Sequence, residues 1–401
     1  MVTTQKVTFE GALGETLAAR LETPLGPPRA YALFAHCFSC SKDIHTASRI
    51  SRGLAEKGIA VLRFDFTGLG QSDGDFANTN FSSNVDDLIK AAQFLRDEFE
   101  APRLLVGHSL GGAAVIAAAG RIEGVKAVAT LGAPADAEHV KTNFVEHVDA
   151  IEKDGEAEVS LGGRAFRIRK QFLKDIEGRT LDDEVAALKA ALLIAHAPLD
   201  EVVGVDNATR LFVAAKHPKS FLSLDDADHL ISDPAHALSA ARVIAAWAER
   251  YAAPDPLPDP PRPLKEDSSA VVQETGLGGY HGWAVVGGGH SFTVDEPEDH
   301  GGLDGGASPY QILSAALGAC TTMTLRMYAQ RKGWNWGRIT TQVRHQKADG
   351  RDRFDRVVTV EGELTDEQAD KLVEIAGKCP VHRTLERGSD IDTRAEVETN
   401  A

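Results

Sequence analysis

Several features that define specialised protein classes are scarce in this chain. Its 43 Lys and Arg residues face 59 Asp and Glu residues, so the formal net charge of −16 argues against nucleic acid or an anionic membrane as a partner. No run approaches the roughly 18 apolar residues of a membrane span, and residues 1–20 lack the pattern of a signal peptide. Four cysteines do not make a disulfide scaffold, so we expect reduced thiols and a cytoplasmic location.

The chain is nevertheless rich enough in apolar residues to fold. Hydrophobic residues make up 43% and charged residues 25%, which is typical of a globular protein. A length of 401 residues favours two domains over one core. Residues 251–267 read YAAPDPLPDPPRPLKED, and their six prolines predict a stiff, extended linker. We therefore expect domains at 1–250 and 268–401, joined by a proline-rich linker at 251–267.

The first part alternates strand-like and helix-like stretches. Apolar runs that predict strands occur at 31–35, 59–64, 104–106, 127–131, 191–195 and 220–224. Helix-length stretches such as 85–99 separate most of them, which favours a parallel, doubly wound α/β sheet covered on both faces. The alternation is interrupted at about 136–187, where Val159 to Ile168 alternate around Gly162-Gly163. We interpret this interruption as a small cap with a hairpin.

The second part has a different order of elements. Strand-like segments at 269–275, 282–286 and 290–294 precede a helix that begins with the capping box Ser308 to Gln311. Further strand-like segments at 339–345 and 356–363 precede a second capping box, at 365–368, and a final strand is expected near 390–397. Strands separated by single helices predict an α+β domain.

The segment Gly107-His108-Ser109-Leu110-Gly111 is typical of a nucleophile elbow. The apolar run 104–106 suits a buried strand, and the small residues 112–119 suit a packed helix. A strand, a tight turn and a helix present a serine hydroxyl at the carboxyl edge of a sheet, and flanking glycines relieve crowding in that turn. We therefore predict Ser109 as a catalytic nucleophile.

A serine nucleophile needs a base and an acid that orients it. Asp200 and His229 follow successive strand-like runs, which places both at the same sheet edge as Ser109. Asp206, Asp228, His217 and His236 are the competing candidates, and they fit this position less well. For the backbone N–H groups that stabilise an oxyanion, we predict Leu110 after the elbow and Phe38 after the first parallel strand.

These motifs give residues 1–250 a resemblance to the α/β-hydrolase superfamily. The segment Arg63 to Ser72 is similar to a characteristic loop of that superfamily, and His36 to Ser39 is similar to its His-Gly-x loop, with Cys37 in place of glycine. The resemblance implies hydrolysis of a carboxylic ester or thioester through an acyl-enzyme. Haloperoxidases and C–C bond hydrolases share the same triad. An alternative is that residues 1–250 only bind acyl ligands without hydrolysing them. The complete triad argues against this alternative.

The second part contains one cysteine on each of its predicted helices. Ile312, Ala316, Cys320, Met323 and Met327 share one helical face, and Cys379 closes the helix that carries Ala369, Leu372, Val373 and Ala376. Both thiols are therefore expected in apolar surroundings where the two helices pack. Buried packing cysteines and a redox pair are both compatible with this pattern.

The sequence from Ser308 to Thr321, together with Cys379-Pro380-Val381-His382, resembles the OsmC/Ohr family of hydroperoxide reductases over about 268–401. The resemblance implies a homodimer in which Cys320 attacks an organic hydroperoxide, Cys379 resolves the sulfenic acid, and a dithiol completes the cycle without metal or flavin. The chain departs from the family because it lacks the upstream arginine and the first-turn glutamate. His290 and His300 are the candidate substitutes.

Cys37 and Cys40 form a C-x-x-C beside the predicted hydrolase site. Without a second pair at ligand spacing we expect no zinc, and we expect no cofactor elsewhere. We interpret both residues as packing residues, with redox coupling to the second domain as the alternative. The sequence thus predicts an esterase fused to a hydroperoxide-reducing OsmC-like domain. The competing hypothesis makes that domain a dimerisation and substrate-shaping module without redox turnover.

Overall fold

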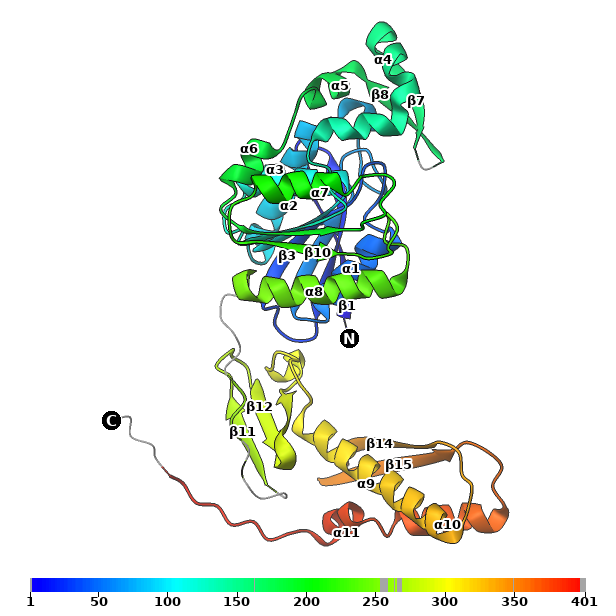
Figure 1. Ribbon diagram of the computed structural model, residues 1–401. Coiled ribbons are helices and arrows are strands. Elements are labelled where there is room, and N and C mark those ends of the chain that lie inside the picture. The colour runs from blue at the N-terminus through cyan, green and yellow to red at the C-terminus, as the bar shows by residue number, and fades with distance from the viewer. Residues whose placement is uncertain are drawn as a thin grey trace. The chain divides into compact units, whose positions relative to one another are not determined.

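The computed structural model describes residues 2–161, 163–252, 259–262, 264, 269–348 and 350–396 (Figure 1). The chain divides into two compact units, Met1–Pro258 and Asp259–Ala401, and each is described by itself. The boundary falls within the proline-rich stretch 251–267, most of which lies outside the described residues. Among the residues described, no helix is both long and apolar enough to cross a membrane.

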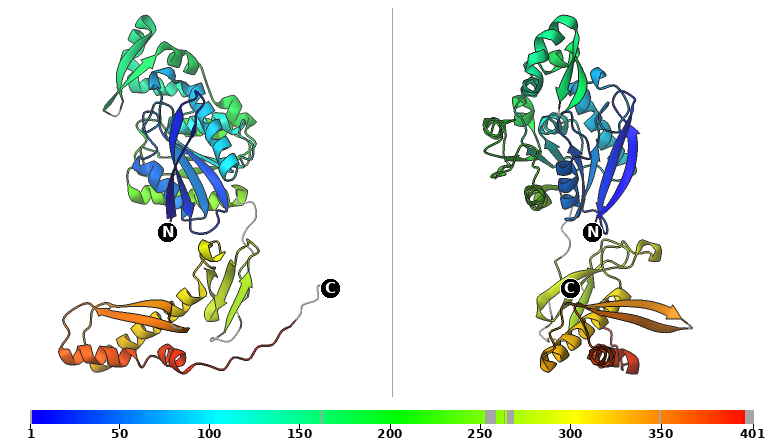
Figure 2. Two further views of the ribbon diagram at one scale, coloured as in Figure 1. Left: turned by 180° about the vertical axis from the view of Figure 1, so that it is seen from behind. Right: turned by 90° about the vertical axis from the view of Figure 1, so that its right-hand side faces the viewer.

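An eight-stranded sheet forms the centre of the first unit. Its spatial order is β1 (Val2–Glu10), β2 (Thr16–Pro24), β4 (Ile59–Phe64), β3 (Ala30–Ala35), β5 (Leu104–His108), β6 (Ala127–Leu131), β9 (Ala191–His196) and β10 (Lys219–Ser223). Strands β4, β3, β5, β6, β9 and β10 run parallel, whereas β1 and β2 form an antiparallel hairpin that extends the edge (Figure 2). The sequence reasoning missed this hairpin because an exposed edge strand such as β1 carries no continuous apolar run.

Helices cover both faces of this sheet. Helices α1 (His45–Ala55) and α8 (Pro234–Ala252) pack together on one face, and their apolar side chains meet Phe34, Val61 and Val106 of the sheet. On the other face, α2 (Phe81–Glu98) packs against β3, α3 (Leu110–Ala119) packs against β5, and α7 (Asp206–Ala214) lies beside β9. The central strands are buried on both faces, as expected of a parallel sheet.

A cap interrupts the alternation between β6 and β9. It comprises the 3₁₀ segment η2 (Ala137–His147), α4 (Val148–Asp154), the hairpin β7 (Glu156–Leu161) and β8 (Arg164–Arg169), α5 (Lys170–Ile176) and α6 (Asp182–Ala187). The cap lies over the carboxyl edge of the strands, with a further 3₁₀ segment, η1 (Phe76–Asn78), against β8 (Figure 1). Gly162, in the predicted turn of the hairpin, lies outside the described residues.

In its described residues, the second unit contains two small antiparallel sheets and three helices. The first sheet consists of β11 (Ala270–Glu274), β12 (Gly282–Val286) and β13 (His290–Val294), with 3₁₀ segments η3 (Gly287–Gly289) and η4 (Glu298–His300). Helix α9 (Pro309–Lys332) packs against the hairpin of β14 (Ile339–Ala348) and β15 (Arg351–Val360), and α10 (Asp366–Ala376) and α11 (Pro380–Arg387) complete the described elements. The predicted fold class is confirmed: a doubly wound α/β sheet with a small cap, followed by an OsmC-like α+β domain.

Three predictions for the second unit were wrong. Residues 388–396 form no strand, because the described structure offers them no neighbouring strand to pair with. Cys379 does not close α10: that helix ends at Ala376, and Cys379 caps the amino end of α11. The predicted apolar face of α9 is largely exposed, with Met323 and Met327 64% and 69% accessible, because Leu317, Leu325 and Ala329 face the core of the unit instead.

Candidate active site

Ser109 occupies the sharp turn between β5 and α3. Its φ of 55° and ψ of −127° lie in a region that residues other than glycine rarely adopt. The neighbouring glycines permit the turn: a Cβ on Gly107 would lie 2.3 Å from the carbonyl oxygen of Gly111, and one on Gly111 would lie 2.4 Å from that of His36. The turn therefore presents the Ser109 hydroxyl at the carboxyl edge of the sheet, as a nucleophile elbow does.

The structure brings Ser109, His229 and Asp200 together. His229 Nε2 lies 3.0 Å from Ser109 Oγ, and His229 Nδ1 lies 2.7 Å from Asp200 Oδ2. The other Asp200 oxygen accepts hydrogen bonds from the amides of Val202 and Val203, each at 2.9 Å. Burial acts to raise the Asp200 pKa, but the hydrogen bonds from His229 and these amides outweigh it, so the pKa lies below its usual value. Asp200 is thus held as a carboxylate that accepts a hydrogen bond from His229.

The competing candidates lie outside this hydrogen-bonded chain. Asp206 begins α7, and Asp228 accepts hydrogen bonds from the amide and hydroxyl of Ser232 at 2.7 Å. His236 pairs with Asp226 at 3.2 Å, and His217 precedes Pro218 in the loop before β10. Their environments are those of loop and helix-cap residues.

A further histidine, His108, contacts both the backbone and the ring of His229. Its Nε2 lies 2.7 Å from the His229 carbonyl oxygen, and the two ring centroids are 5.2 Å apart. Burial, together with the nearby His229, lowers the His108 pKa to about 4, so the ring is neutral at pH 7. The elbow pattern leaves the residue type at His108 unspecified, although alternation along β5 indicates a side chain opposite to that of Ser109.

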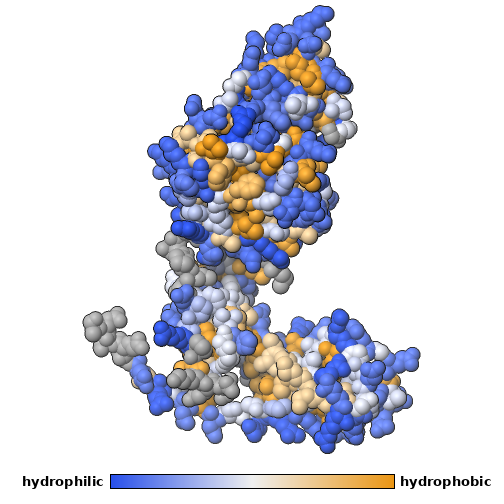
Figure 3. Space-filling model, viewed as in Figure 1, coloured by the Kyte–Doolittle hydropathy of each residue, from blue (hydrophilic) through white to orange (hydrophobic). Residues whose placement is uncertain are grey.

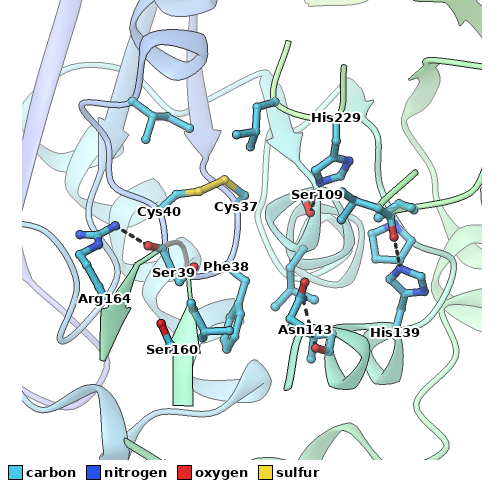
Figure 4. A pocket seen from close by; sticks show the side chains of 18 residues that line it. Cys37, Phe38, Ser39, Cys40, Ser109, His139, Asn143, Ser160, Arg164 and His229 are labelled. Carbon is cyan, nitrogen blue, oxygen red and sulfur yellow. Dashed lines mark hydrogen bonds between the residues drawn. A yellow bond between two sulfur atoms is a disulfide. The ribbon is translucent and has the colours of Figure 1, made fainter. Parts of the chain in front are cut away.

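Ser109 and His229 open into a cavity of about 430 Å³ beneath the cap (Figure 4). The wall combines the loop after β3, the start of α3, the loop after β9 and the cap. Lining residues are Cys37, Phe38, Ser39, Cys40, Ile44, Ser109, Leu110, Pro134, His139, Val140, Asn143, Ser160, Leu161, Arg164, Val202, Val203, His229 and Leu230. Among the described lining residues, Arg164 is the only one with a permanent charge, and most others are apolar. This composition suits an uncharged acyl group beside the serine.

Both predicted oxyanion donors line the same cavity. The Leu110 amide lies at the amino end of α3, where helical N–H groups lack partners within the helix. Phe38 follows β3 on the loop across the cavity, and its ring packs against Phe76, Phe144 and Phe172. The two predicted oxyanion donors therefore lie in the wall of the same cavity as Ser109, one on the loop after β3 and the other at the start of α3.

Cys37 and Cys40 are joined by a disulfide, with a Cα–Cα distance of 5.3 Å (Figure 4). The prediction that these cysteines are reduced packing residues was therefore wrong. A turn brings them together, because the Cys40 amide donates to the Cys37 carbonyl oxygen at 3.1 Å. Within the described residues, no group of three or more His, Cys, Asp or Glu side chains is arranged to hold a metal ion.

Cys320 and Cys379 are free thiols in the second unit, Cys320 partly exposed and Cys379 buried. Burial acts to raise the Cys379 pKa, but hydrogen bonds from the His382 amide, Thr321 and Cys320, with the positive charge of Arg356, lower it overall. Arg356 Nη1 donates to Thr321 Oγ1 at 2.7 Å, and that hydroxyl lies 3.7 Å from Cys379 Sγ.

In the sequence, His290 and His300 are the candidate substitutes for the missing positive charge before Cys320. His290 is exposed, and His300 Nδ1 lies 3.8 Å from Glu296 Oε2. Arg356 comes instead from β15, after the first cysteine. Its signal in the sequence was weak because β15 contains several arginines, and only pairing with β14 decides which of them faces α9.

Comparison with known proteins supports these assignments of fold. The sequence model of the alpha/beta hydrolase family matches residues 32–299, and that of OsmC-like protein matches residues 301–394. The esterase domain of a Rhodothermus marinus protein is 51% identical, covers 62% of this chain and 99% of its own, and superposes with a TM-score of 0.53.

Mouse palmitoyl-protein thioesterase ABHD10, which is mitochondrial, is 33% identical over 156 residues, which are 36% of this chain. The chain spans about half the length of the curated relatives that it matches first. The mouse ABHD10 structure, at 24% identity and a TM-score of 0.51, covers 61% of this chain and 99% of its own, and shows the shared fold. The chain belongs to the alpha/beta hydrolase family and carries an OsmC-like domain after its hydrolase domain.

Proposed function

We propose that the first unit hydrolyses carboxylic esters or thioesters through an acyl-enzyme on Ser109. The observation that carries the proposal is the hydrogen-bonded chain from Asp200 through His229 to Ser109 at the wall of the cavity. His229 accepts the hydroxyl proton as Ser109 Oγ attacks the acyl carbon, and Asp200 stabilises the resulting imidazolium. His229 then protonates the leaving alcohol or thiol, and water releases the acid by the same route.

The amides of Leu110 and Phe38 are the proposed donors to the oxyanion of both tetrahedral intermediates. The names of two relatives, an esterase domain and a palmitoyl-protein thioesterase, favour ester and thioester substrates over the other reactions that use the same triad. The mostly apolar wall of the cavity is compatible with an acyl chain.

Replacement of the nucleophile tests this proposal. We expect Ser109→Ala to lower kcat for a p-nitrophenyl ester by about 10⁴-fold or more, because no other group supplies the attacking oxygen. The full-length protein and the variant are compared by initial rates, with thermal unfolding as a control for folding. Wild-type turnover in the variant would remove Ser109 from the mechanism.

A second activity is proposed for Cys320 and Cys379, which lie close together as free thiols with Arg356 nearby. In the proposed reaction the Cys320 thiolate attacks a hydroperoxide oxygen and becomes a sulfenic acid as an alcohol leaves. The Cys379 thiol then forms a disulfide with Cys320 and releases water, and a dithiol reduces that disulfide.

We expect the protein to consume cumene hydroperoxide in the presence of a dithiol, and Cys320→Ser to abolish this turnover. Arg356→Met should slow formation of the Cys320–Cys379 disulfide at neutral pH more than at high pH, because Arg356 favours the thiolate of Cys379, the residue that attacks the sulfenic acid. If the unchanged protein consumes no more peroxide than Cys320→Ser, the second unit is instead a dimerisation and substrate-shaping module without redox turnover.

A homodimer through the second unit is also part of the proposal. The outer face of α9 exposes Met323 and Met327, and Val373 of α10 is 73% exposed. Figure 3 shows hydrophobic surface over part of α9. A second copy of the same unit would cover such a face, and sedimentation of the full-length chain measures whether it does.

A further inference from the structure

The Cys37–Cys40 disulfide lies in the wall of the cavity that contains Ser109. Both half-cystines line this cavity, and the two residues between them, Phe38 and Ser39, line it as well (Figure 4). Phe38 is the residue whose amide is proposed to stabilise the oxyanion. The disulfide therefore closes a small ring around a part of the proposed hydrolytic site.

Buried contacts hold both ends of the loop formed by residues 36–43. At one end, His36 is 1% exposed, and its ring packs edge-on against Phe66 with a centroid distance of 5.0 Å. At the other end, the Lys42 amide and ammonium group donate to the two oxygens of Asp65, at 2.5 and 2.7 Å. Loss of the disulfide would consequently free the segment between these anchors rather than unfold the whole loop.

The segment between the anchors adopts an unfavourable backbone conformation. Ser39 has a φ of 60°, in the left-handed region that L-residues other than glycine avoid. Two contacts hold it there: the disulfide ring, and a hydrogen bond of 2.6 Å from Arg164 of the cap to the Ser39 carbonyl oxygen. Because Arg164 is a surface residue, we expect the disulfide to be the stronger of the two constraints.

The two sulfurs differ in their access to a reagent. Cys37 is 4% exposed, whereas Cys40 is half-buried at the wall of the cavity. A small dithiol that enters the cavity therefore meets the Cys40 sulfur first, which leaves Cys37 as the leaving thiolate.

We propose that Cys37 and Cys40 form a thiol–disulfide exchange site that controls ester hydrolysis at Ser109, an inference that rests on the proposed esterase function. A thiolate of a small dithiol attacks Cys40 Sγ, the disulfide breaks, and Cys37 leaves as a thiolate that takes up a proton. The reagent's second thiol then attacks the reagent's other sulfur, which is bonded to Cys40 Sγ. The mixed disulfide breaks and Cys40 is released as a thiolate that takes up a proton. Two electrons and two protons pass to the protein, and the reagent becomes a cyclic disulfide.

Reduction releases Ser39 from its left-handed conformation, and the adjoining Phe38 amide loses its alignment with the oxyanion. A donor used in the transition state affects kcat more than KM. We therefore expect reduction to lower kcat by about ten-fold or more, toward the loss of about 10²–10³ that follows removal of an oxyanion donor. KM should change by less than about three-fold, because the remaining wall of the cavity is unaltered.

The test uses full-length protein with Cys320→Ser and Cys379→Ser, so that Cys37 and Cys40 are the remaining cysteines. Hydrolysis of p-nitrophenyl acetate is measured after equilibration with mixtures of reduced and oxidised dithiothreitol, and thiols are counted in the same samples. We expect kcat to fall in step with the appearance of two thiols and to recover on reoxidation. The matched variant, with Cys37→Ser and Cys40→Ser added, should have the low kcat at every ratio.

Two results would overturn the proposal: two thiols that appear without a change in kcat, or a matched variant with the kcat of the oxidised protein. The first result needs no variant of the loop and so remains decisive if that variant folds poorly. Failure of the esterase function is distinguishable, because the oxidised protein would then hydrolyse no more ester than Ser109→Ala while the thiol count still reports exchange.

Discussion

The buried imidazole of His108 links the loop that carries His229 to the core of the first unit. Its Nε2 lies within hydrogen-bonding distance of the His229 carbonyl oxygen, and no partner is seen for its Nδ1 in the described structure. A proton on both nitrogens would add a buried charge next to His229, which is the physical reason for the low pKa of about 4. The folded structure thus accommodates His108 in its neutral form.

This low pKa predicts that acid destabilises the first unit. Between about pH 6.5 and pH 4 the unfolded chain binds a proton at His108 and the folded chain does not, so stability is present above this window and falls within it. We expect the free energy of unfolding to drop by about 2 to 3 kcal/mol between pH 7 and pH 4.5 from this group. Urea unfolding of residues 1–258, followed by the fluorescence of their only tryptophan, Trp247, measures the change.

His108→Gln is the matched variant, because a glutamine amide can still donate to the His229 carbonyl but does not titrate. Between pH 7 and pH 4.5, the unfolding free energy of His108→Gln should fall by about 2 to 3 kcal/mol less than that of the unchanged protein. An identical pH dependence in both proteins would mean that other groups, such as the buried His36, account for the acid sensitivity.

The loop after β3 depends on a buried ion pair between Lys42 and Asp65. Their side chains are 2% and 0% exposed, and Lys42 Nζ also donates to Gln71 Oε1 at 3.0 Å. Removing one partner of a buried pair leaves an uncompensated charge, whereas removing both leaves none. The pair is therefore a structural anchor for the loop after β3 rather than a surface interaction.

We expect Lys42→Met to cost about 3–5 kcal/mol in unfolding free energy, because it leaves the Asp65 carboxylate buried without its ammonium partner. Asp65→Asn should cost less, because Lys42 Nζ still lies 3.4 Å from Asp43 Oδ2. The double variant should cost less than the sum by about 1–3 kcal/mol. Urea unfolding of the four proteins gives the coupling. For comparison, the more exposed Lys141–Glu138 pair, at 2.7 Å, should show coupling below about 1 kcal/mol, and equal coupling at both pairs would contradict the anchor role.

The secondary structure followed the local sequence wherever apolar runs are continuous. The six predicted strands of the parallel sheet correspond to β3, β4, β5, β6, β9 and β10. Capping boxes begin α9 and α10 at Ser308 and Thr365, as predicted, because a cap involves side chains only three residues apart. The exposed hairpin β1–β2 and the irregular segment 388–396 depend on neighbours that no local pattern specifies.

The two units have separate cores, and this predicts that hydrolysis belongs to the first unit. Every residue lining the Ser109 cavity comes from residues 37–230. We expect residues 1–258 to retain kcat/KM for p-nitrophenyl acetate within about three-fold of the full chain, since the described wall of the cavity is complete without the second unit. A loss of about 100-fold in the shortened protein would instead support a substrate-shaping role for the OsmC-like domain.

The sequence alone determined the fold class and the order of the two domains, because glycine spacing, apolar periodicity and family motifs are properties of contiguous segments. It also predicted Ser109, Asp200 and His229, since each follows a strand of one sheet and parallel strands bring their carboxyl ends to a common edge. The tertiary structure decided what depends on distance between remote segments. It placed Arg356 near Cys379, turned the apolar stripe of α9 outward, and closed the Cys37–Cys40 ring in the wall of the Ser109 cavity.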